Sequence, residues 1–275
     1  MKSKKQNTIL FFSLTLLLVF TFVLNISLGQ VSIPVKEVFK SLSGAIASKD
    51  TWEYIIVNFR LPKAITAVLV GMGLSISGLL MQTLFRNPLA GPYVLGLSSG
   101  SSLGVALIIL GAAFLPSLVS EILLSSYGII VASCLGSFLV LLLVLIVSSR
   151  LRDTATILIV GLMFSSFTSA IVSVLTYFSS AEQLQKFTFW SMGNLGNLSW
   201  QNIIILAIVI TIGLVLSLIS IKSLDALLLG ENYAKSMGLN IKKSRYIIII
   251  ATSLLAGSIT AFAGPIAFIG LAVPH

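Results

Sequence analysis

The sequence predicts an all-α fold, a polytopic transmembrane helical bundle. Of the 275 residues, 57% are hydrophobic and only 9% are charged, whereas soluble domains carry about 25% charged residues. This small number of charges leaves too little polar surface for a water-facing exterior. We therefore expect the chain to be surrounded mostly by lipid. A soluble protein with an unusually large core is excluded by the same shortage of charge.

Seven long apolar runs and the start of an eighth define the expected spans. A helix needs about 20 mostly apolar residues to cross the hydrocarbon core of a bilayer. The runs are continuous, unlike the short alternating segments of β-barrel strands. They lie at Thr8–Leu28, Ala64–Leu84, Tyr93–Phe114, Tyr127–Ser148, Thr154–Phe178, Gln201–Ile221 and Tyr246–Ala263, with a partial run from Ile266 to His275.

Charges and prolines agree on the boundaries of these runs. All eight acidic residues lie between runs, and all seven prolines lie in loops or at run ends. A charge in hydrocarbon and a proline inside a helix are unfavourable for separate reasons, so the two signals are independent. We therefore expect residues 1–275 to form a single transmembrane domain.

The first run, Thr8–Leu28, has two interpretations. Lys2, Lys4 and Lys5 precede it and Ser27-Leu28-Gly29 follows, as in a cleaved signal peptide. The run is longer than a usual signal core and many spans follow it, so we favour an uncleaved first helix.

The distribution of lysine and arginine predicts the orientation. With the N-terminus inside, the inner loops hold eleven basic residues and the outer loops six, as the positive-inside rule requires. We expect a multi-pass protein of the cytoplasmic (inner) membrane with a cytoplasmic N-terminus. The basic residues form no concentrated tract, which excludes nucleic acid as a partner.

Small and hydroxyl residues recur within two of the runs. Gly96, Gly100 and Gly104 repeat every four residues, and Gly71 with Ser75 makes a similar pair. Such spacing is typical of closely packed membrane helices. A phosphate loop is excluded because no Gly-Lys-Ser/Thr sequence follows the glycines. The fifth run is the most polar, which fits either interhelical hydrogen bonds or a wet pathway; its candidates are Ser165, Ser166, Thr168, Ser169 and Ser173.

The spans lack the residues that proton-driven carriers and intramembrane enzymes use. No acidic residue or histidine lies at mid-span, and the only histidine is His275. We therefore expect no catalytic residue, no metal site and no cofactor bound by this chain. If the chain moves a solute, the energy has to come from another polypeptide.

The loop 222–245 is the longest one on the predicted cytoplasmic side. We expect two short helices, Leu224–Leu229 and Glu231–Met237, separated by Gly230 and ended by Gly238. The loop is either an ordered connector or a docking element for a cytoplasmic partner.

The predicted outer segment, residues 29–63, carries a possible surface helix from Pro34 to about Ala45. It ends in Arg60-Leu61-Pro62-Lys63. The two cations are either interfacial anchors or a fixed basic patch for an acidic partner.

Several motifs in order resemble one family. They are Arg60-Leu61-Pro62-Lys63, Gly78-Leu79-Leu80-Met81-Gln82, Arg86-Asn87-Pro88-Leu89-Ala90, Phe189-Trp190-Ser191-Met192-Gly193, Gly230-Glu231 with Ala234 and Gly238, and Gly264–His275. Together they resemble the iron-chelate (siderophore or haem) and cobalamin import permeases, which are transmembrane subunits of type II ATP-binding-cassette (ABC) importers. The resemblance runs along essentially the whole chain.

The resemblance implies an importer with defined partners. A permease of this family pairs with a second permease copy, two cytoplasmic ATPase subunits that bind ATP and magnesium, and an extracytoplasmic substrate-binding protein. It translocates its substrate into the cytoplasm by alternating access. The resemblance assigns Arg60 and Lys63 to binding-protein docking, the polar fifth run to the pathway, and Leu224, Asp225, Gly230, Glu231, Ala234 and Gly238 to ATPase coupling.

One feature departs from the family pattern. Members have ten spans, whereas this chain ends after about seven and a half, so we expect it to be C-terminally truncated. An autonomous secondary carrier or channel, or a non-functional permease fragment, remains the alternative. Gradient-driven flux without an ATPase would indicate the carrier.

Overall fold

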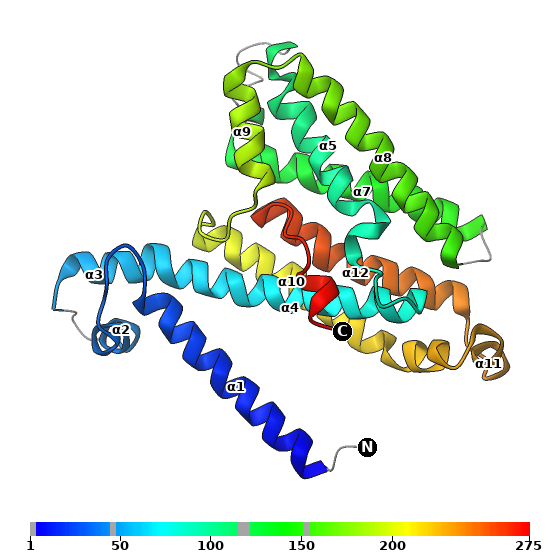
Figure 1. The fold of residues 1–275 in the computed structure, drawn as a ribbon, viewed down its shortest axis with the longest axis horizontal. Coiled ribbons are helices and arrows are strands. Elements are labelled where there is room, and N and C mark those ends of the chain that lie inside the picture. The colour runs from blue at the N-terminus through cyan, green and yellow to red at the C-terminus, as the bar shows by residue number, and fades with distance from the viewer. Residues whose placement is uncertain (1–3, 45–47, 115–121, 151–153) are drawn as a thin grey trace. The chain divides into compact units, whose positions relative to one another are not determined.

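Every regular element in the described part of the chain is a helix (Figure 1). The computed structural model describes residues 4–44, 48–114, 122–150 and 154–275. Their contacts form two compact units, Met1–Val68 with Leu195–Ile203, and Leu69–Asn194 with Ile204–His275. The predicted all-α fold is confirmed.

Six helices in the described ranges are long and apolar enough to cross a membrane. Each corresponds to one of the expected runs and begins or ends within a few residues of it, except where α10 continues further. They are α1 (Lys4–Ser27), α4 (Leu61–Phe85), α7 (Ser126–Arg150), α8 (Thr154–Tyr177), α10 (Trp200–Leu228) and α12 (Ile241–Ala263).

The run Tyr93–Phe114, expected as one span, is divided into three pieces. A 3₁₀ turn η2 (Pro92–Leu95) leads to α5 (Leu97–Ile109), and a second turn η3 (Gly111–Phe114) follows. The break lies at Gly96, whose φ of +79° is left-handed and favours glycine. With 13 residues, α5 is roughly 20 Å long, shorter than the hydrocarbon core.

Glycines let α5 and α7 pack backbone to backbone. A Cβ added to Gly104 would lie 2.2 Å from the Ala132 carbonyl oxygen, and one on Gly136 would lie 2.1 Å from that of Gly100. Close approach through small residues is how helices associate in lipid. Figure 1 shows α5 beside α7 and α8, with α9 (Ala181–Ser191) at one end of the group.

The first unit has its own small core. Helix α2 (Val35–Leu42), helix α3 (Asp50–Ile55) and a π-helical turn η1 (Ile56–Arg60) follow α1. Their buried side chains are Ile26, Ile33, Val38, Ile56 and Ala64. The surface helix expected from Pro34 is thus α2, and Ala45 lies outside the described residues.

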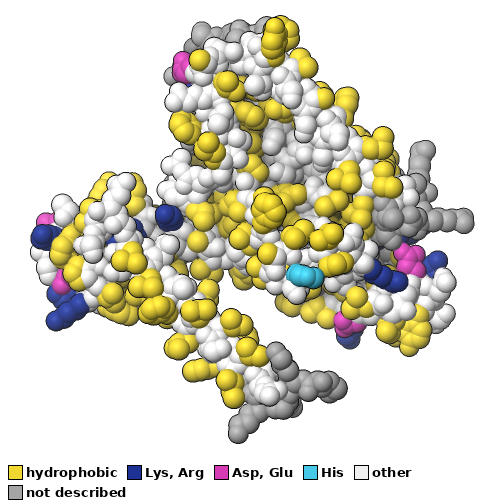
Figure 2. Space-filling view, viewed as in Figure 1, with side chains coloured by type: hydrophobic (Ala, Val, Ile, Leu, Met, Phe, Trp, Pro, Cys, Tyr) yellow, Lys and Arg dark blue, Asp and Glu magenta, His cyan; other side chains and the backbone are white. Residues whose placement is uncertain are grey.

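The N-terminal helix exposes apolar side chains along most of its length. Phe11, Phe12 and Leu16 are 65–76% exposed, and Figure 2 shows hydrophobic side chains along the outside of this helix. Water does not stabilise such a surface, and the helix is long and apolar enough to cross a membrane.

The segment after α12 differs from the partial span expected from Ile266. Gly264 has a φ of +76°, the chain then runs without helix, and α13 covers only Ile269–Ala272. Gly270 lies against α4, because a Cβ on Gly78 would be 1.6 Å from the Gly270 carbonyl oxygen. The Gln82 amide donates to the Leu271 carbonyl at 3.0 Å. The motif Gly78–Gln82 and the motif Gly264–His275 are therefore in contact within one unit.

Candidate functional site

The turn between α10 and α12 is the first candidate site. Here α10 continues without a break to Leu228, so the separate short helix expected at Leu224–Leu229 is wrong. Leu224 is buried in this continuation, whereas Asp225 is exposed. The run has no residue that would end the helix before Gly230, and the last turn of α10 therefore forms part of the site.

The second short helix lies close to its predicted bounds. Gly230 precedes α11 (Glu231–Ser236) with a φ of +122°. Gly238 ends it with a φ of +81°, its N–H bonding to the Lys235 carbonyl and that of Leu239 to the Ala234 carbonyl. This pair of hydrogen bonds is the Schellman motif. The Ala234 side chain is fully buried, so α11 is packed in place.

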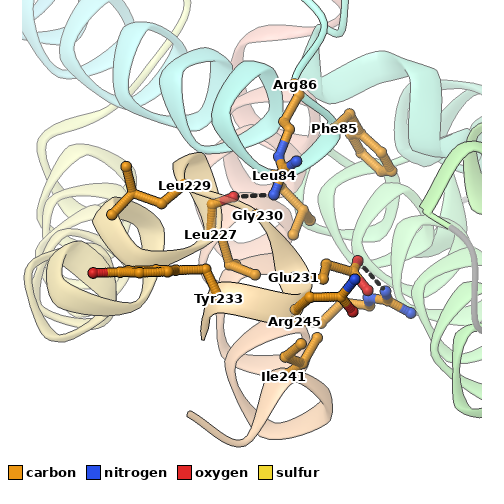
Figure 3. Close-up of a pocket in the computed structure, with 11 residues that line it drawn as sticks. Leu84, Phe85, Arg86, Leu227, Leu229, Gly230, Glu231, Tyr233, Ile241 and Arg245 are labelled. Atoms are coloured by element: carbon orange, nitrogen blue, oxygen red, sulfur yellow. Dashed lines mark hydrogen bonds and ion pairs between the residues drawn. The ribbon is translucent and has the colours of Figure 1, made fainter. Parts of the chain in front are cut away.

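Two arginines hold the turn from inside. Arg245 of α12 lies 3.3 Å from the Glu231 carboxylate, and its side chain is only 5% exposed. Arg86, which follows α4, donates to the Leu227 carbonyl (Figure 3). Arg86 has a φ of +48°, a conformation that non-glycine residues rarely adopt. Its unusual backbone aims the guanidinium at the end of α10.

These residues surround a pocket of about 660 Å³. Figure 3 shows side chains from the end of α4, the end of α10, α11 and the start of α12 around it. The polar members are Arg86, Glu231, Asn232, Tyr233 and Arg245. The turn therefore has a fixed shape with both polar and apolar groups along its walls.

The outside of the turn is apolar. Leu228, Leu229, Tyr233 and Met237 are 57%, 68%, 52% and 63% exposed. Tyr233 and Met237 are one helical turn apart and share a face of α11. We call these four residues the apolar tip. Sequence reasoning missed it, although the spacing of Tyr233 and Met237 beside a predicted loop would have indicated it.

The basic corner at Arg60 and Lys63 is the second candidate site. The Arg60 guanidinium donates to the carbonyls of Ile26 at 2.7 Å and Ser27 at 2.8 Å, and also to that of Val31. It thus caps the C-terminal end of α1, where carbonyls have no helical partner. Lys63, in contrast, is exposed. Only one of the two predicted docking cations presents its charge outward.

A glycine makes room for this cap. A Cβ on Gly29 would lie 2.8 Å from Nη2 of Arg60, so any side chain there would push the guanidinium away. The corner is also joined to the second segment of its unit, because the Trp200 indole donates to the Val57 carbonyl at 3.2 Å.

The hydroxyls of α8 bond mainly to their own helix. Ser166, Thr168 and Ser173 donate to carbonyls four residues earlier, at 2.9–3.0 Å. Thr168 is buried, Ser165 half-buried, and Ser166, Ser169 and Ser173 are exposed on one face. No interhelical bond is recorded for Ser166, Thr168 or Ser173 within the described residues.

Of the predicted packing residues, Gly96, Gly100 and Gly104 lie in close contacts and Gly71 does not. A Cβ on Gly96 would meet the Gly161 carbonyl at 3.2 Å, whereas nothing lies within 4 Å of one on Gly71. Ser75 donates to the Gly71 carbonyl within α4. Gly73 and Gly78 are close-packed glycines of this helix, against Ile259 and Gly270.

Helix α9 was not expected from the sequence. Ser180 and Gln183 form a reciprocal capping box at its start, a Ser-x-x-Gln signal that is visible in the sequence. Lys186 lies 2.8 Å from Glu182, and this contact holds the pKa of the Glu182 carboxyl below its usual value. Asn194, just beyond, donates to the Ala263 carbonyl at 2.8 Å.

Metal-ligating side chains do not cluster in the described residues. Among them, no group of three or more His, Cys, Asp or Glu is placed to hold an ion.

The chain matches known transport proteins along nearly its whole length. Residues 17–275 match the model of the FecCD transport family. The chain is 34% identical to the hemin transport system permease protein HmuU of Yersinia pestis, over all of this chain and 80% of the relative. It is 33% identical to the vitamin B12 import system permease protein BtuC of Klebsiella pneumoniae, over 96% of this chain and 74% of the relative.

A solved structure has the same fold. It is described as a metal-chelate type ABC transporter in an inward-facing conformation, and it matches with a TM-score of 0.78 and 31% identity, over 95% of this chain and 78% of that one. These matches, with the helical fold and the motifs that meet in it, establish the identity of the chain. It belongs to the FecCD transport family and is an ABC importer permease.

Proposed function

We propose that this permease carries an iron chelate, haem or cobalamin into the cytoplasm by alternating access. Two ATPase subunits that dock on the turn between α10 and α12 would drive it. ATP and magnesium would bind to those subunits, and this chain would supply no catalytic residue.

The observation that carries the proposal is the apolar tip on a rigid turn. Exposed aromatic and methionine side chains are typical of interface centres. Arg86, Glu231 and Arg245 fix the turn from inside, so force applied to α11 would reach α10 and α12 rather than be lost in a flexible loop. Such stiffness is what a mechanical coupling element needs.

The substrate class rests on the relatives. Hemin and vitamin B12 appear in the names of two of them, and the solved structure is described as metal-chelate type. The metal in hemin, in vitamin B12 and in metal chelates is what these names share, and it supports the proposed substrate class. The exposed serines of α8, Ser166, Ser169 and Ser173, are our candidates for the pathway wall, facing a second permease copy.

For the extracytoplasmic side, we propose that Lys63 contacts an acidic residue of the substrate-binding protein. Arg60 would position this contact by fixing the end of α1 beside the start of α4. This arrangement requires an external Lys63 and a cytoplasmic N-terminus, as the distribution of basic residues predicts.

The coupling proposal is tested by removing the apolar tip. The double variant Tyr233→Ala/Met237→Ala should weaken ATPase binding by about tenfold, which is about 1.4 kcal/mol. Both side chains are more than half exposed, so the fold should be unaffected. The measurement is ATPase affinity, with ATP-driven uptake in proteoliposomes.

The matched control is Tyr177→Ala, because Tyr177 is a tyrosine that is 83% exposed at the end of α8. It should leave ATPase affinity unchanged. Full affinity and coupled uptake in the Tyr233→Ala/Met237→Ala variant would contradict the docking site.

The substrate is tested by direct uptake measurements. Uptake of radiolabelled haem, a ferric siderophore and cobalamin should identify one that saturates and depends on ATP. Uptake of a simple oxyanion with none of the three would contradict the proposed class.

A further inference from the structure

Helix α2 presents three chemically different faces. Val38 is fully buried in the core of the first unit, and the Glu37 residue is 7% exposed beside it. Val35, Phe39 and Leu42 are apolar and 41%, 57% and 43% exposed. The third face carries Lys36 and Lys40, which completes a helix with a protein side, an apolar side and a cationic side.

The spacing separates these faces cleanly. At 100° per residue, Val35, Phe39 and Leu42 fall within about 60° of one another. Lys36 and Lys40 lie next to them around the helix, on the side away from Val38. Two cations beside an apolar stripe are typical of helices that lie in the membrane interface.

The position of α2 places it at the level of the membrane surface. Helix α1, whose exposed apolar surface requires lipid, ends at Ser27. The Ser27 hydroxyl donates to the Ile33 carbonyl at 2.6 Å, and the Ile33 N–H returns to the Ser27 carbonyl. This loop brings α2 back against the end of α1, where hydrocarbon gives way to head groups.

The apolar stripe of α2 continues that of α1. Leu28 and Val31, between the two helices, are 62% and 43% exposed. Exposed apolar side chains thus occur in α1, in the loop and in α2, with the exposed polar residues Gln30 and Ser32 between them in the loop. Continuity with a lipid-covered surface favours lipid over a protein as the occupant.

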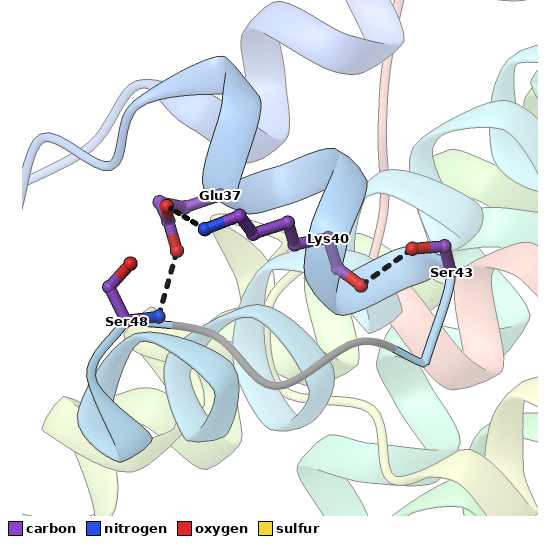
Figure 4. Close-up of polar contacts among 4 residues, drawn as sticks. All are labelled: Glu37, Lys40, Ser43 and Ser48. Carbon is purple, nitrogen blue, oxygen red and sulfur yellow. Dashed lines mark hydrogen bonds and ion pairs between the residues drawn. The ribbon is translucent and has the colours of Figure 1, made fainter.

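Glu37 fixes the rotation of the helix. Its carboxylate accepts from Lys40 Nζ and from the Ser48 N–H, both at 2.8 Å (Figure 4). These contacts lower the pKa of the carboxyl to about 2, so the pair persists at any physiological pH. Since Ser48 leads into α3, the same carboxylate joins α2 to the segment that reaches the basic corner.

We propose that α2 is an interfacial helix whose Val35, Phe39 and Leu42 side chains insert at the boundary between head groups and acyl chains of the bilayer. Lys36 faces the water and the lipid phosphates, whereas the ammonium group of Lys40 is paired with Glu37. The helix thereby anchors the segment between α1 and α4 at a fixed depth, and with it the corner that carries Lys63.

Depth-dependent fluorescence quenching tests this directly. Cys134 is the only cysteine, so Cys134→Ala gives a background for the single-site variants Phe39→Cys, Leu42→Cys and Lys36→Cys. Each is labelled with NBD and reconstituted as the full chain in vesicles of phosphatidylethanolamine and phosphatidylglycerol. Quenching by a nitroxide on the upper acyl chain is compared with quenching by aqueous iodide.

The labels at positions 39 and 42 should be quenched several-fold more by the lipid nitroxide than the label at 36, and iodide should show the reverse order. Equal iodide access at all three positions would overturn the proposal. Protection of position 39 only after the binding protein is added, or only at protein densities that favour a second copy, would assign the stripe to that protein instead and equally overturn it.

Discussion

The basic corner and the α10–α12 turn use their arginines in the same way but expose different chemistry. Arg60 at the corner, and Arg86 and Arg245 at the turn, all bind groups of the chain itself. What remains exposed is a single cation, Lys63, at the corner and the apolar tip at the turn. The arginines therefore stabilise the two candidate sites internally, and other residues form their exposed surfaces.

This difference indicates two kinds of contact. An exposed cation attracts an acidic partner at a distance, and salt screens that attraction. An apolar surface gains its affinity from burial and is less sensitive to salt. We propose the first kind of contact for the substrate-binding protein and the second for the ATPase.

The largest expected effect is that of Arg60→Ala. It removes the guanidinium donor from the carbonyls of Ile26, Ser27 and Val31, of which Ser27 keeps only the Ile33 N–H, so we expect a loss of about 3 kcal/mol in the free energy of unfolding. Thermal unfolding of the detergent-solubilised chain measures it, and Lys63→Ala is the control. Should Arg60→Ala weaken binding-protein affinity while leaving stability untouched, Arg60 would be a docking residue and the comparison would fail.

At the turn, Arg245→Ala should be the next largest. The Arg245 side chain is 5% exposed, whereas Glu231 at 34% can hydrate once its partner is lost, so we expect a loss of about 1.5 kcal/mol. Lys242→Ala, an exposed cation of the same helix, should have no effect. A protease-accessibility assay at α11 would show whether the turn becomes more mobile. Unchanged protection would show that the contact between Arg245 and Glu231 does not stabilise the turn.

Gly29→Ala should have a smaller effect through the same cap. The new Cβ would lie 2.8 Å from the guanidinium, which can move because it ends a flexible side chain, so we expect about 1 kcal/mol. In the Arg60→Ala background the substitution should cost almost nothing, because residues that share one contact are not additive. Equal costs in both backgrounds would show that Gly29 acts independently of Arg60.

The smallest effect is the pH dependence of Glu37→Gln. Because the folded-state pKa of Glu37 is lowered from 4.5 to about 2, its stabilising contribution is complete above pH 4.5 and is lost as the pH falls toward 2. The stability difference between the natural chain and the variant should therefore be constant near neutrality and shrink on acidification. A difference that grows in acid would have the wrong sign for this carboxylate.

The spans and the short helix α11 were predictable because they depend on local signals. Long apolar runs, proline positions and the glycines at 230 and 238 act within a few residues of themselves. The break at Gly96 was not predictable, since it depends on how closely α7 and α8 approach α5.

The two candidate sites were predictable in place but not in detail. The sequence located the basic corner, yet the carbonyls that bind Arg60 lie about thirty residues away along the chain, beyond any local pattern. Similarly, the contact of Arg86 with the Leu227 carbonyl joins the end of α10 to a residue that follows a different helix. Tertiary contacts decide which charged residues are exposed.

We propose that the corner and the turn face opposite sides of the membrane and meet different partners. Single cysteines at Lys63→Cys and Met237→Cys, in the Cys134→Ala background, can be labelled with a membrane-impermeant maleimide in sealed vesicles of known orientation. We expect labelling of position 63 only from outside and of position 237 only from the cytoplasmic side. We also expect the binding protein to protect position 63 and the ATPase to protect position 237. Labelling of both positions from the same side would contradict it.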